Sequence, residues 1–522
     1  MHEHRLRQML EAHIAQGRFD AALVLLEQWQ GQAPRQLLPE LIRARLEFMQ
    51  GRYRAARARF LQAVQERECA PSDVLELVNG LRLFVAHDAM IAWAESYPHR
   101  NALRAVDQVL AAASLSTIGA QDLARRWADE AVAKAPDDGI CRVNRALILN
   151  YAGDFDAARA DLDHVLGGPQ ESAMGYWLAA RVSRQTPDRN HVGALRERLG
   201  RSTLHPRDRE FLYFALFKEL DDLGDRPGAW EALSAGCRVA RTRAPYDAAM
   251  QERLFAHLRQ PIRAVPVADP PPVGAPVPIF IVGMHRSGTT LLESMLSAHP
   301  EVHAYGESQR LSAALRLAAD RYCQGVIDDG LAQRLPDLDY RAARDSFLGE
   351  GRRLVGQATH VTEKMPGNFQ LVGAIRHALP HARVIHMRRD PMDVCFANLR
   401  EHFADGVSHA NSAVDVAHYH ALYRGLMAHW QEVYPGFVLD VDYESLVTDP
   451  VAESRRVYAF CGLPWDDGVT DPARWAGRAI TTLSSLQARG TIHRNRVGGW
   501  RAYAQWLEPL QEALGVTEVS AS

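Results

Sequence analysis

The chain has 522 residues, of which 47% are hydrophobic and 24% are charged, and it is long enough for two to four globular domains. Its 60 basic and 63 acidic side chains give a formal net charge of −3. This balance argues against a broad nucleic-acid-binding or membrane-binding surface, since either would need a large basic excess. A small, locally basic pocket is still compatible with it.

Six cysteines lie far apart in the sequence, and none has the spacing of a metal-ligand set. In a chain of this size the pattern predicts reduced thiols and no metal site. The first residues carry charges throughout, and no apolar run approaches the roughly 18 residues that a membrane-spanning helix needs. We therefore expect a cytoplasmic protein with no membrane span and no nucleic-acid partner.

Residues 1–258 contain a repeated pattern of a glycine, an aromatic residue two positions later and a pair of alanines. Glycine permits a tight turn between two helices, and small residues let the helices pack closely. The period of 34 residues resembles the tetratricopeptide repeat and predicts an all-α superhelix; the alternative is an irregular helical domain with chance spacing. The clear copies are GRFDAA at Gly17, GRYRAA at Gly51 and GDFDAA at Gly153, with weaker copies at Gly119 and Gly224.

Such a superhelix presents a concave face that suits a peptide or protein partner. The same face could equally serve for self-association of the protein or brace the rest of the chain. The sequence leaves these three roles open.

Residues 259–278 contain seven prolines and predict an extended linker between the helical domain and a second domain, residues 279–522. That second domain alternates apolar runs with helical patterns, which predicts an α/β fold with a central parallel sheet. Ligands of such sheets bind at the carboxyl ends of the strands. The predicted strands are 279–284, 360–364, 383–389 and 437–444, and the predicted helices are 288–298, one from Pro391 and one over 449–461.

The sequence GMHRSGTT, from Gly283 to Thr290, follows the first predicted strand and precedes a helix. The main-chain amides of such a turn, together with the helix N-terminus, bind an anion. A nucleotide-triphosphate loop ends in GK[ST], but here Thr289 stands at the lysine position and Arg286 lies inside the loop. This favours an anion held without a metal ion over a P-loop kinase or nucleotidase, which is the alternative enzyme class.

At these residues the chain resembles sulfotransferases that use 3′-phosphoadenosine 5′-phosphosulfate (PAPS). The resemblance covers about residues 277–511 and is closest to the branch with protein-tyrosine sulfotransferases and bacterial tetratricopeptide-repeat sulfotransferases. It implies a P-loop-like α/β domain, PAPS as the sulfo donor, no metal, and a hydroxyl-bearing acceptor such as a peptide or protein tyrosine, a small molecule or a glycan. A repeat scaffold with a decayed sulfotransferase domain is the non-catalytic alternative.

The resemblance also implies a donor site. Arg389, which ends the RVIHMRR strand, would hold the 3′-phosphate, and Tyr443 would lie near that phosphate or the adenine. The chain departs from the family at Ala397, which replaces a serine, and at Gly499, which replaces a lysine or arginine. The implied donor-binding residues are Gly283, Arg286, Ser287, Gly288, Thr289, Thr290, Arg389, Asn398 or Arg400 in place of the serine, Tyr443, and Arg496 among the nearby Arg489, Arg494 and Arg501.

Four residues carry the implied chemistry. An acceptor hydroxyl must lose a proton as it attacks sulfur, and Glu307 matches the glutamate that acts as general base in the tyrosine-sulfotransferase branch. Lys364 matches a lysine near the sulfo group, and Arg286 and Ser484 would help to stabilise that group. The histidines His303 and His285 are the alternative bases.

Overall fold

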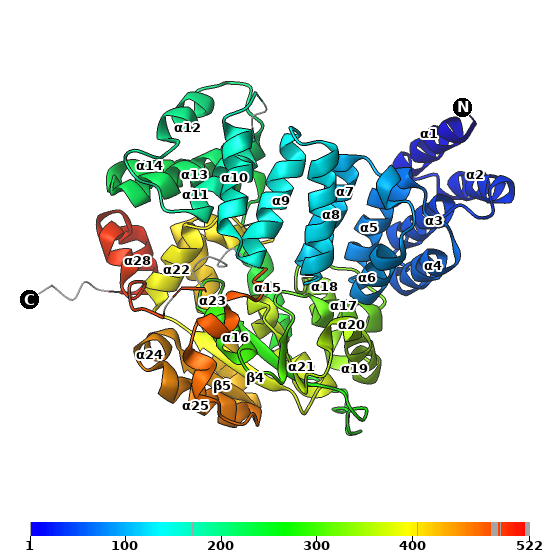
Figure 1. The fold of residues 1–522 in the computed structure, drawn as a ribbon. Coiled ribbons are helices and arrows are strands. Elements are labelled where there is room, and N and C mark those ends of the chain that lie inside the picture. The colour runs from blue at the N-terminus through cyan, green and yellow to red at the C-terminus, as the bar shows by residue number, and fades with distance from the viewer. Residues whose placement is uncertain (1, 170–171, 404–405, 482–488, 491, 517–522) are drawn as a thin grey trace, which may run out of the picture.

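The computed structural model describes residues 2–169, 172–403, 406–481, 489–490 and 492–516 (Figure 1). Its first half is helical, and successive helices pack side by side in pairs. The helices are α1 His2–Ala15, α2 Phe19–Gln32, α3 Leu38–Met49, α4 Tyr53–Glu66, α5 Val74–Leu83, α6 His87–Ser96, α7 Ala105–Thr117, α8 Gln121–Lys134, α9 Gly139–Ala152, α10 Phe155–Leu166, α11 Ala173–Val182, α12 Val192–Leu199, α13 Pro206–Leu223, α14 Arg226–Arg243 and α15 Ala248–Leu258.

The turns between paired helices keep the 34-residue spacing. Each repeat glycine adopts a left-handed backbone, with φ between 69° and 90°. Val85, which is 34 residues after Gly51 and 34 before Gly119, also has a positive φ, of 50°. The pattern therefore runs unbroken from Gly17 to Gly153, and the copy at Val85 is hidden in the sequence because valine replaces the glycine. A β-branched residue rarely adopts this conformation.

The second half contains a five-stranded parallel sheet in the order β2-β3-β1-β4-β5. The prediction of a mostly helical first region followed by a central parallel sheet is confirmed. The strands are β1 Val277–Gly283, β2 Val302–Ala304, β3 His360–Glu363, β4 Arg383–Arg388 and β5 Val438–Asp442. The sequence analysis missed the edge strand β2, whose three residues are too few to show an alternating pattern.

Helices pack around the sheet (Figure 1). Three of them match predictions closely: α16 Thr289–Ser297, α22 Pro391–Leu399 and α25 Pro450–Cys461. The others are α17 Arg310–Ala318, α18 Asp329–Ala332, α19 Tyr340–Gly349, α20 Arg352–Val355, α21 Val372–Ala378, α23 Ala413–Val433, α24 Tyr443–Thr448, α26 Ala473–Ala476 and α28 Glu508–Leu514. Within the described ranges, no helix combines the length and apolar character that crossing a bilayer requires.

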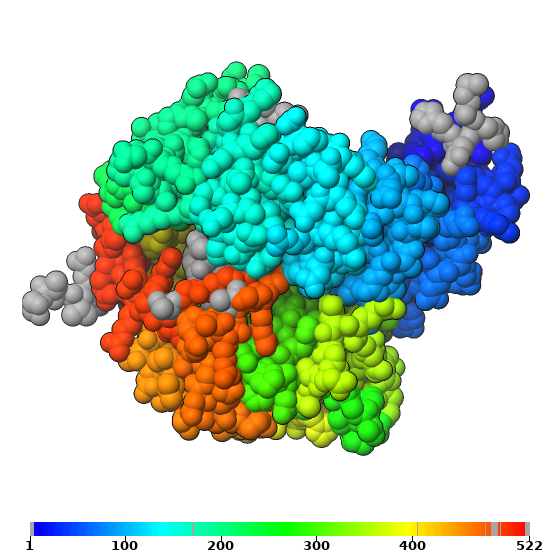
Figure 2. Space-filling model, in the orientation of Figure 1, coloured from blue at the N-terminus to red at the C-terminus, as the bar shows by residue number. Residues whose placement is uncertain are grey.

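Residues 259–276 form neither helix nor strand, and β1 begins at Val277, inside the proline-rich segment. The apolar core nevertheless crosses this segment, because buried side chains from Val143 onward and from the sheet domain form one cluster. Phe255 of α15 packs against Phe369, with ring centroids 6.0 Å apart. In Figures 1 and 2 the helices lie along one side of the sheet domain, and the C-terminal segment lies at the junction of the two.

Candidate functional site

The loop between β1 and α16 has a backbone that depends on its two glycines. Gly283 has φ 150° and Gly288 has φ 102°. A Cβ at Gly283 would lie 2.5 Å from the carbonyl oxygen of Met387, and one at Gly288 would lie 2.5 Å from the ring of Tyr443. Because both contacts are shorter than real Cβ contacts, neither position can carry a side chain without displacing its neighbours.

The loop presents hydrogen-bond donors at the carboxyl end of β1 and the N-terminus of α16. Arg286 adopts a left-handed backbone with φ 66°. The hydroxyl of Ser287 is buried and has no hydrogen-bond partner among the described residues. A buried hydroxyl without a partner costs free energy, so an anion that accepts its hydrogen bond would be stabilised.

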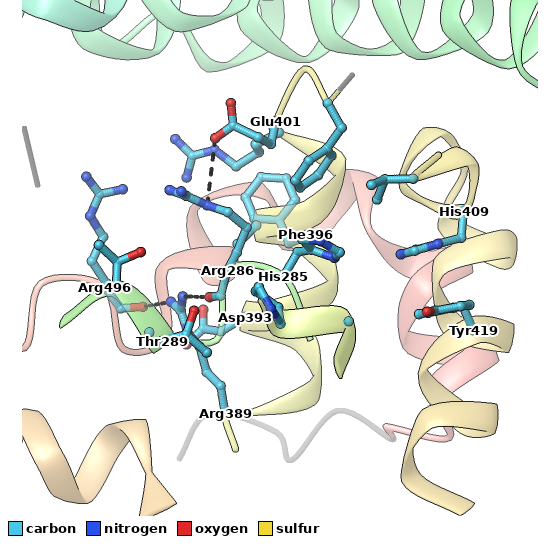
Figure 3. A pocket seen from close by; sticks show the side chains of 18 of the residues that line it. His285, Arg286, Thr289, Arg389, Asp393, Phe396, Glu401, His409, Tyr419 and Arg496 are labelled. Atoms are coloured by element: carbon cyan, nitrogen blue, oxygen red, sulfur yellow. Dashed lines mark hydrogen bonds and ion pairs between the residues drawn. The ribbon is translucent and has the colours of Figure 1, made fainter. Parts of the chain in front are cut away.

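A cleft of about 1320 Å³ opens in front of this loop (Figure 3). Both halves of the chain line it. The helical half contributes side chains of α11, α13 and α15, including Trp177, Arg181, Lys218, Asp221 and Leu254. The sheet domain contributes His285, Arg286, Gly288, Thr289, Thr290, Glu307, Arg389, Ala397, Arg400, Glu401, His409, Tyr419, Tyr443, Arg496 and Gly499.

Arg388, the last residue of β4, and Arg389, which follows it, have different partners. Arg388 is exposed and forms ion pairs with Asp442 at 2.8 Å and Asp440 at 3.2 Å. Arg389 donates instead to two main-chain carbonyls, that of Arg286 at 2.9 Å and that of Arg496 at 2.7 Å. Its guanidinium also lies 4.7 Å from the ring centroid of Tyr443. Carbonyl groups orient Arg389 without neutralising it, so its charge is directed at the cleft.

Arg400 and Arg496 also line the cleft. In the sequence they lie three residues from Ala397 and Gly499, where the resemblance implies a serine and a lysine or arginine. Desolvation and the nearby charges of Arg400 and Arg389 lower the pKa of Arg496. Arg400 lines the cleft beside Ala397 while bonding Asp221 at 2.7 Å. Asn398 has a different position, because its amide donates to the carbonyls of His285 at 2.7 Å and Val394 at 2.8 Å and so supports the loop from behind.

Glu307 and Lys364 form a pair at the cleft edge. The Lys364 Nζ lies 2.5 Å from Glu307 Oε1. The lysine side chain is fully buried, whereas 40% of the glutamate side chain is exposed. Lys364 follows β3, and its amide donates to the carbonyl of Gly306 at 3.0 Å. The strand end thus fixes the ammonium group, and the ammonium group fixes the carboxylate.

The turn that carries Glu307 rests on a second carboxylate that the sequence analysis did not single out. Glu293 of α16 accepts hydrogen bonds from the amide of Gly306 at 3.1 Å and the hydroxyl of Thr362 at 2.8 Å. Burial raises the pKa of Glu293. A polar residue on the apolar face of the predicted helix 288–298 was the available signal, since buried carboxylates need partners.

The alternative bases differ in position. His285 lines the cleft and packs against Phe403, and burial lowers its pKa. His303 packs edge-on against Tyr305 with ring centroids 4.9 Å apart, and burial lowers its pKa to about 4. His285 is therefore the alternative that faces the cleft.

His409 and Tyr419 form the other end of the cleft, opposite the arginines (Figure 3). Their rings stack with centroids 3.7 Å apart and an interplanar angle of 5°. Burial lowers the pKa of His409 well below its usual range, so the ring is neutral. The sequence analysis missed both residues, which belong to no motif. The cleft thus has a cationic end and a neutral aromatic end, with the loop between them.

Ser484 lies outside the described residues. Of the neighbouring arginines, Arg489 donates to the carbonyls of Tyr151 at 2.7 Å and Arg478 at 2.6 Å. Arg501 packs over Trp500 at 5.3 Å. Across the described part of the chain, no group of three His, Cys, Asp or Glu side chains is arranged to hold a metal ion.

Part of the second half is similar to known sulfotransferases. Residues 278–467 match the sequence model described as the sulfotransferase family. An uncharacterized protein of Aquifex aeolicus is 31% identical over 317 residues, which are 58% of this chain and 41% of the relative. Protein-tyrosine sulfotransferase A of Caenorhabditis elegans is 26% identical over 224 residues, which are 40% of this chain and 56% of the relative. The chain thus spans about half the length of these two relatives.

Solved structures of sulfotransferases are also similar to this chain. The sulfotransferase domain of the Synechococcus PCC 7002 olefin synthase aligns with 46% of this chain and 96% of its own length. The sequence identity is 19% and the TM-score is 0.30.

Proposed function

We propose that the cleft transfers the sulfo group of PAPS to a hydroxyl group of an acceptor, because residues 278–467 match the sequence model of the sulfotransferase family. The observation that carries the proposal is that two kinds of group line one cleft: a glycine-built anion loop with Arg389 beside it, and the partly exposed carboxylate of Glu307. The first suits a polyanionic donor and the second suits a hydroxyl that must lose its proton.

The residues at the cationic end fit the donor. The buried hydroxyl of Ser287 and the buried Nε of Arg389 have no hydrogen-bond partner among the described residues. We assign the loop amides, Ser287 and Arg286 to the 5′ group of the donor, and Arg389, Arg496 and Arg400 to its 3′-phosphate. PAPS, when bound, supplies an activated sulfo group. Charge-assisted hydrogen bonds contribute about 1.5 to 3 kcal/mol each, and a few of them suffice for micromolar binding, about 8 kcal/mol.

Glu307 is the proposed base. Lys364 occupies Oε1 of its carboxylate at 2.5 Å, so we assign Oε2 to accept the proton of the acceptor hydroxyl. The acceptor oxygen then forms a bond to sulfur while the bond from sulfur to the 5′-phosphate oxygen breaks. The cations beside the loop stabilise the charge that develops on this phosphate. The products are a sulfate ester and adenosine 3′,5′-bisphosphate.

The finer assignments belong to the same proposal. We propose that the helical half is a tetratricopeptide-type superhelix, which the 34-residue spacing of its left-handed turns supports. We propose a P-loop-like loop and a peptide or protein tyrosine as acceptor; the similarity to protein-tyrosine sulfotransferase A of Caenorhabditis elegans supports the latter. A cytoplasmic location is supported by six buried cysteines that are all free thiols.

Replacing Glu307 with glutamine tests the base. The Glu307→Gln variant should bind adenosine 3′,5′-bisphosphate about as tightly as wild type in calorimetry. It should lose at least about 100-fold in sulfo transfer from labelled PAPS to an acceptor library that contains tyrosine peptides, because general-base catalysis contributes about 10²- to 10⁴-fold. His285→Gln is the matched variant. If it loses transfer while Glu307→Gln stays active, the base is His285.

A further inference from the structure

An arginine of the helical half reaches a buried carboxylate of the sheet domain. Arg181 of α11 contacts both oxygens of Glu401, at 2.7 Å to Oε1 and 3.2 Å to Oε2. The side chain of Glu401 is 5% exposed and that of Arg181 is 18% exposed. Two-point contact of this kind fixes the carboxylate in position as well as in charge.

The same carboxylate lies near the arginine of the anion loop. Glu401 Oε2 is 3.7 Å from Arg286 Nε, which is longer than a hydrogen bond. Figure 3 shows Glu401 above the Arg286 side chain, with both groups at the cleft. One carboxylate is therefore shared by two guanidinium groups and lies closer to Arg181, the one that comes from the helical half.

The charges around Arg286 show what this sharing achieves. Burial, together with the charges of Arg181, Arg496 and Arg389, lowers the pKa of Arg286 to about 10, while Glu401 acts in the opposite direction. The surroundings of Arg286 are thus rich in positive charge. A close ion pair with Glu401 would offset much of that charge and would compete with an anionic ligand for the guanidinium group.

We propose that Arg181 is a positioning residue of the donor site: it holds Glu401 back from Arg286, so that the loop arginine keeps its charge for the anionic donor. The helical half then completes the donor site, independently of any role in choosing the acceptor. This inference rests on the proposed function, because it takes the ligand of the loop to be the 5′ group of PAPS.

The test uses the full-length protein and adenosine 3′,5′-bisphosphate as the probe. Arg181→Met keeps an unbranched apolar stem, which can still pack near Trp177, but frees Glu401 to close on Arg286. We expect the dissociation constant of the bisphosphate, measured by calorimetry, to rise about tenfold or more. The melting temperature should change little, since Glu401 keeps one cationic partner.

The decisive measurement is rescue. In the double variant Arg181→Met/Glu401→Gln, the competing charge is gone, and the dissociation constant should return to within about threefold of wild type. Glu401→Gln alone should bind at least as tightly as wild type. A merely structural role of the ion pair predicts the opposite, with the double variant binding as weakly as Arg181→Met or more weakly.

The outcomes separate this inference from the proposed function. Wild-type protein that binds the bisphosphate, together with an Arg181→Met variant of unchanged affinity, would overturn the inference and leave the sulfotransferase proposal standing. Wild-type protein that neither binds the bisphosphate nor transfers a sulfo group from PAPS would overturn both.

Discussion

Two adjacent arginines at the end of β4, Arg388 and Arg389, contact different parts of the protein. Arg388 is the last residue of the strand and pairs with Asp440 and Asp442 of β5. Arg389 is the next residue, and the carbonyls of Arg286 and Arg496 hold it beside the anion loop. Both side chains are guanidinium groups, but Arg389 lines the cleft and Arg388 does not.

This difference gives a matched pair of variants. Arg389→Met should weaken binding of adenosine 3′,5′-bisphosphate by about 10- to 100-fold, since it removes charge-assisted hydrogen bonds of about 1.5 to 3 kcal/mol each. Arg388→Met should bind within about threefold of wild type, because its carboxylate partners already satisfy it. Calorimetry on both variants measures the difference. Equal losses would mean that Arg389 acts through the sheet and not through the ligand.

Burial of a single histidine predicts how stability depends on pH. His87 of α6 is 5% exposed, and burial together with the charge of Arg310 lowers its pKa to about 3. Its folded pKa is below the unfolded value of about 6.5. Its contribution to stability is therefore complete above pH 6.5 and is lost as the pH falls toward 3, by up to about 1.4 kcal/mol per pH unit.

Replacing this histidine should flatten the acid side of the stability profile. The melting temperature of His87→Gln should fall less steeply than that of wild type between pH 6.5 and 4.5. The exposed His381, changed to glutamine, is the control and should leave the slope unchanged. An unchanged slope in His87→Gln would mean that the histidine is already charged in the folded protein.

The sequence indicated candidate site residues that belong to short contiguous motifs. It could not indicate residues that reach the cleft through an ion pair between distant segments. Glu307 and the loop arginine Arg286 come from short motifs, and the structure gathers both at one cleft. Arg181 and Glu401 are 220 residues apart, and nothing in either segment indicates that they meet. Asn398 shows the opposite limit: a motif position suggested a ligand contact, but its amide bonds the loop backbone.

At the scale of elements, the helix hairpins depend on a left-handed residue in each turn. The sequence identified these turns where glycine is present, and it missed Val85 because valine gives no such signal. The turn at Gly153 has an added role. A Cβ there would lie 2.7 Å from Arg489 Nε, whereas a Cβ at Gly51 would meet nothing within 4 Å. Arg489 of the C-terminal segment therefore packs directly against the turn at Gly153.

Alanine substitutions separate backbone strain from this contact. Gly51→Ala should lower stability by about 1 kcal/mol, the cost of a left-handed backbone at a non-glycine residue. Gly153→Ala has the same strain and must also displace Arg489, so its melting temperature should fall further. It should also make the chain near Arg489 easier to cleave in limited proteolysis. Equal melting temperatures in the two variants would show that Arg489 yields without cost.

At the scale of the whole molecule, the proline-rich segment is a boundary in sequence but not in packing. The sequence indicates the segment by composition alone, and composition does not show what packs across it. One apolar cluster joins α9–α15 to the sheet domain, and Trp230 of α14 stacks on Trp506 at 6.1 Å. A separate, smaller cluster holds α1 and α2 against α3. Folding of the sheet domain should therefore depend on α9–α15 and not on α1 and α2.

Two truncations test this asymmetry. Deletion of residues 1–32 removes α1 and α2 and uncovers only the face of α3 that carries Leu38, Ile42 and Leu46. This variant should elute as a folded species in size-exclusion chromatography and bind adenosine 3′,5′-bisphosphate like wild type. Deletion of residues 1–258 uncovers the shared core around Phe369 and Trp506. Exposed apolar surface of that extent favours aggregation.

The longer truncation also bears on the donor site, because it removes Arg181 along with the core. If residues 259–522 alone eluted as a folded species and bound the bisphosphate with wild-type affinity, the helical half would be dispensable both for folding and for holding Glu401 away from Arg286. Aggregation of this fragment, with full binding by the protein that lacks only residues 1–32, would place the structural requirement in α9–α15. Side chains of these helices share the core, and those of α11, α13 and α15 also line the cleft.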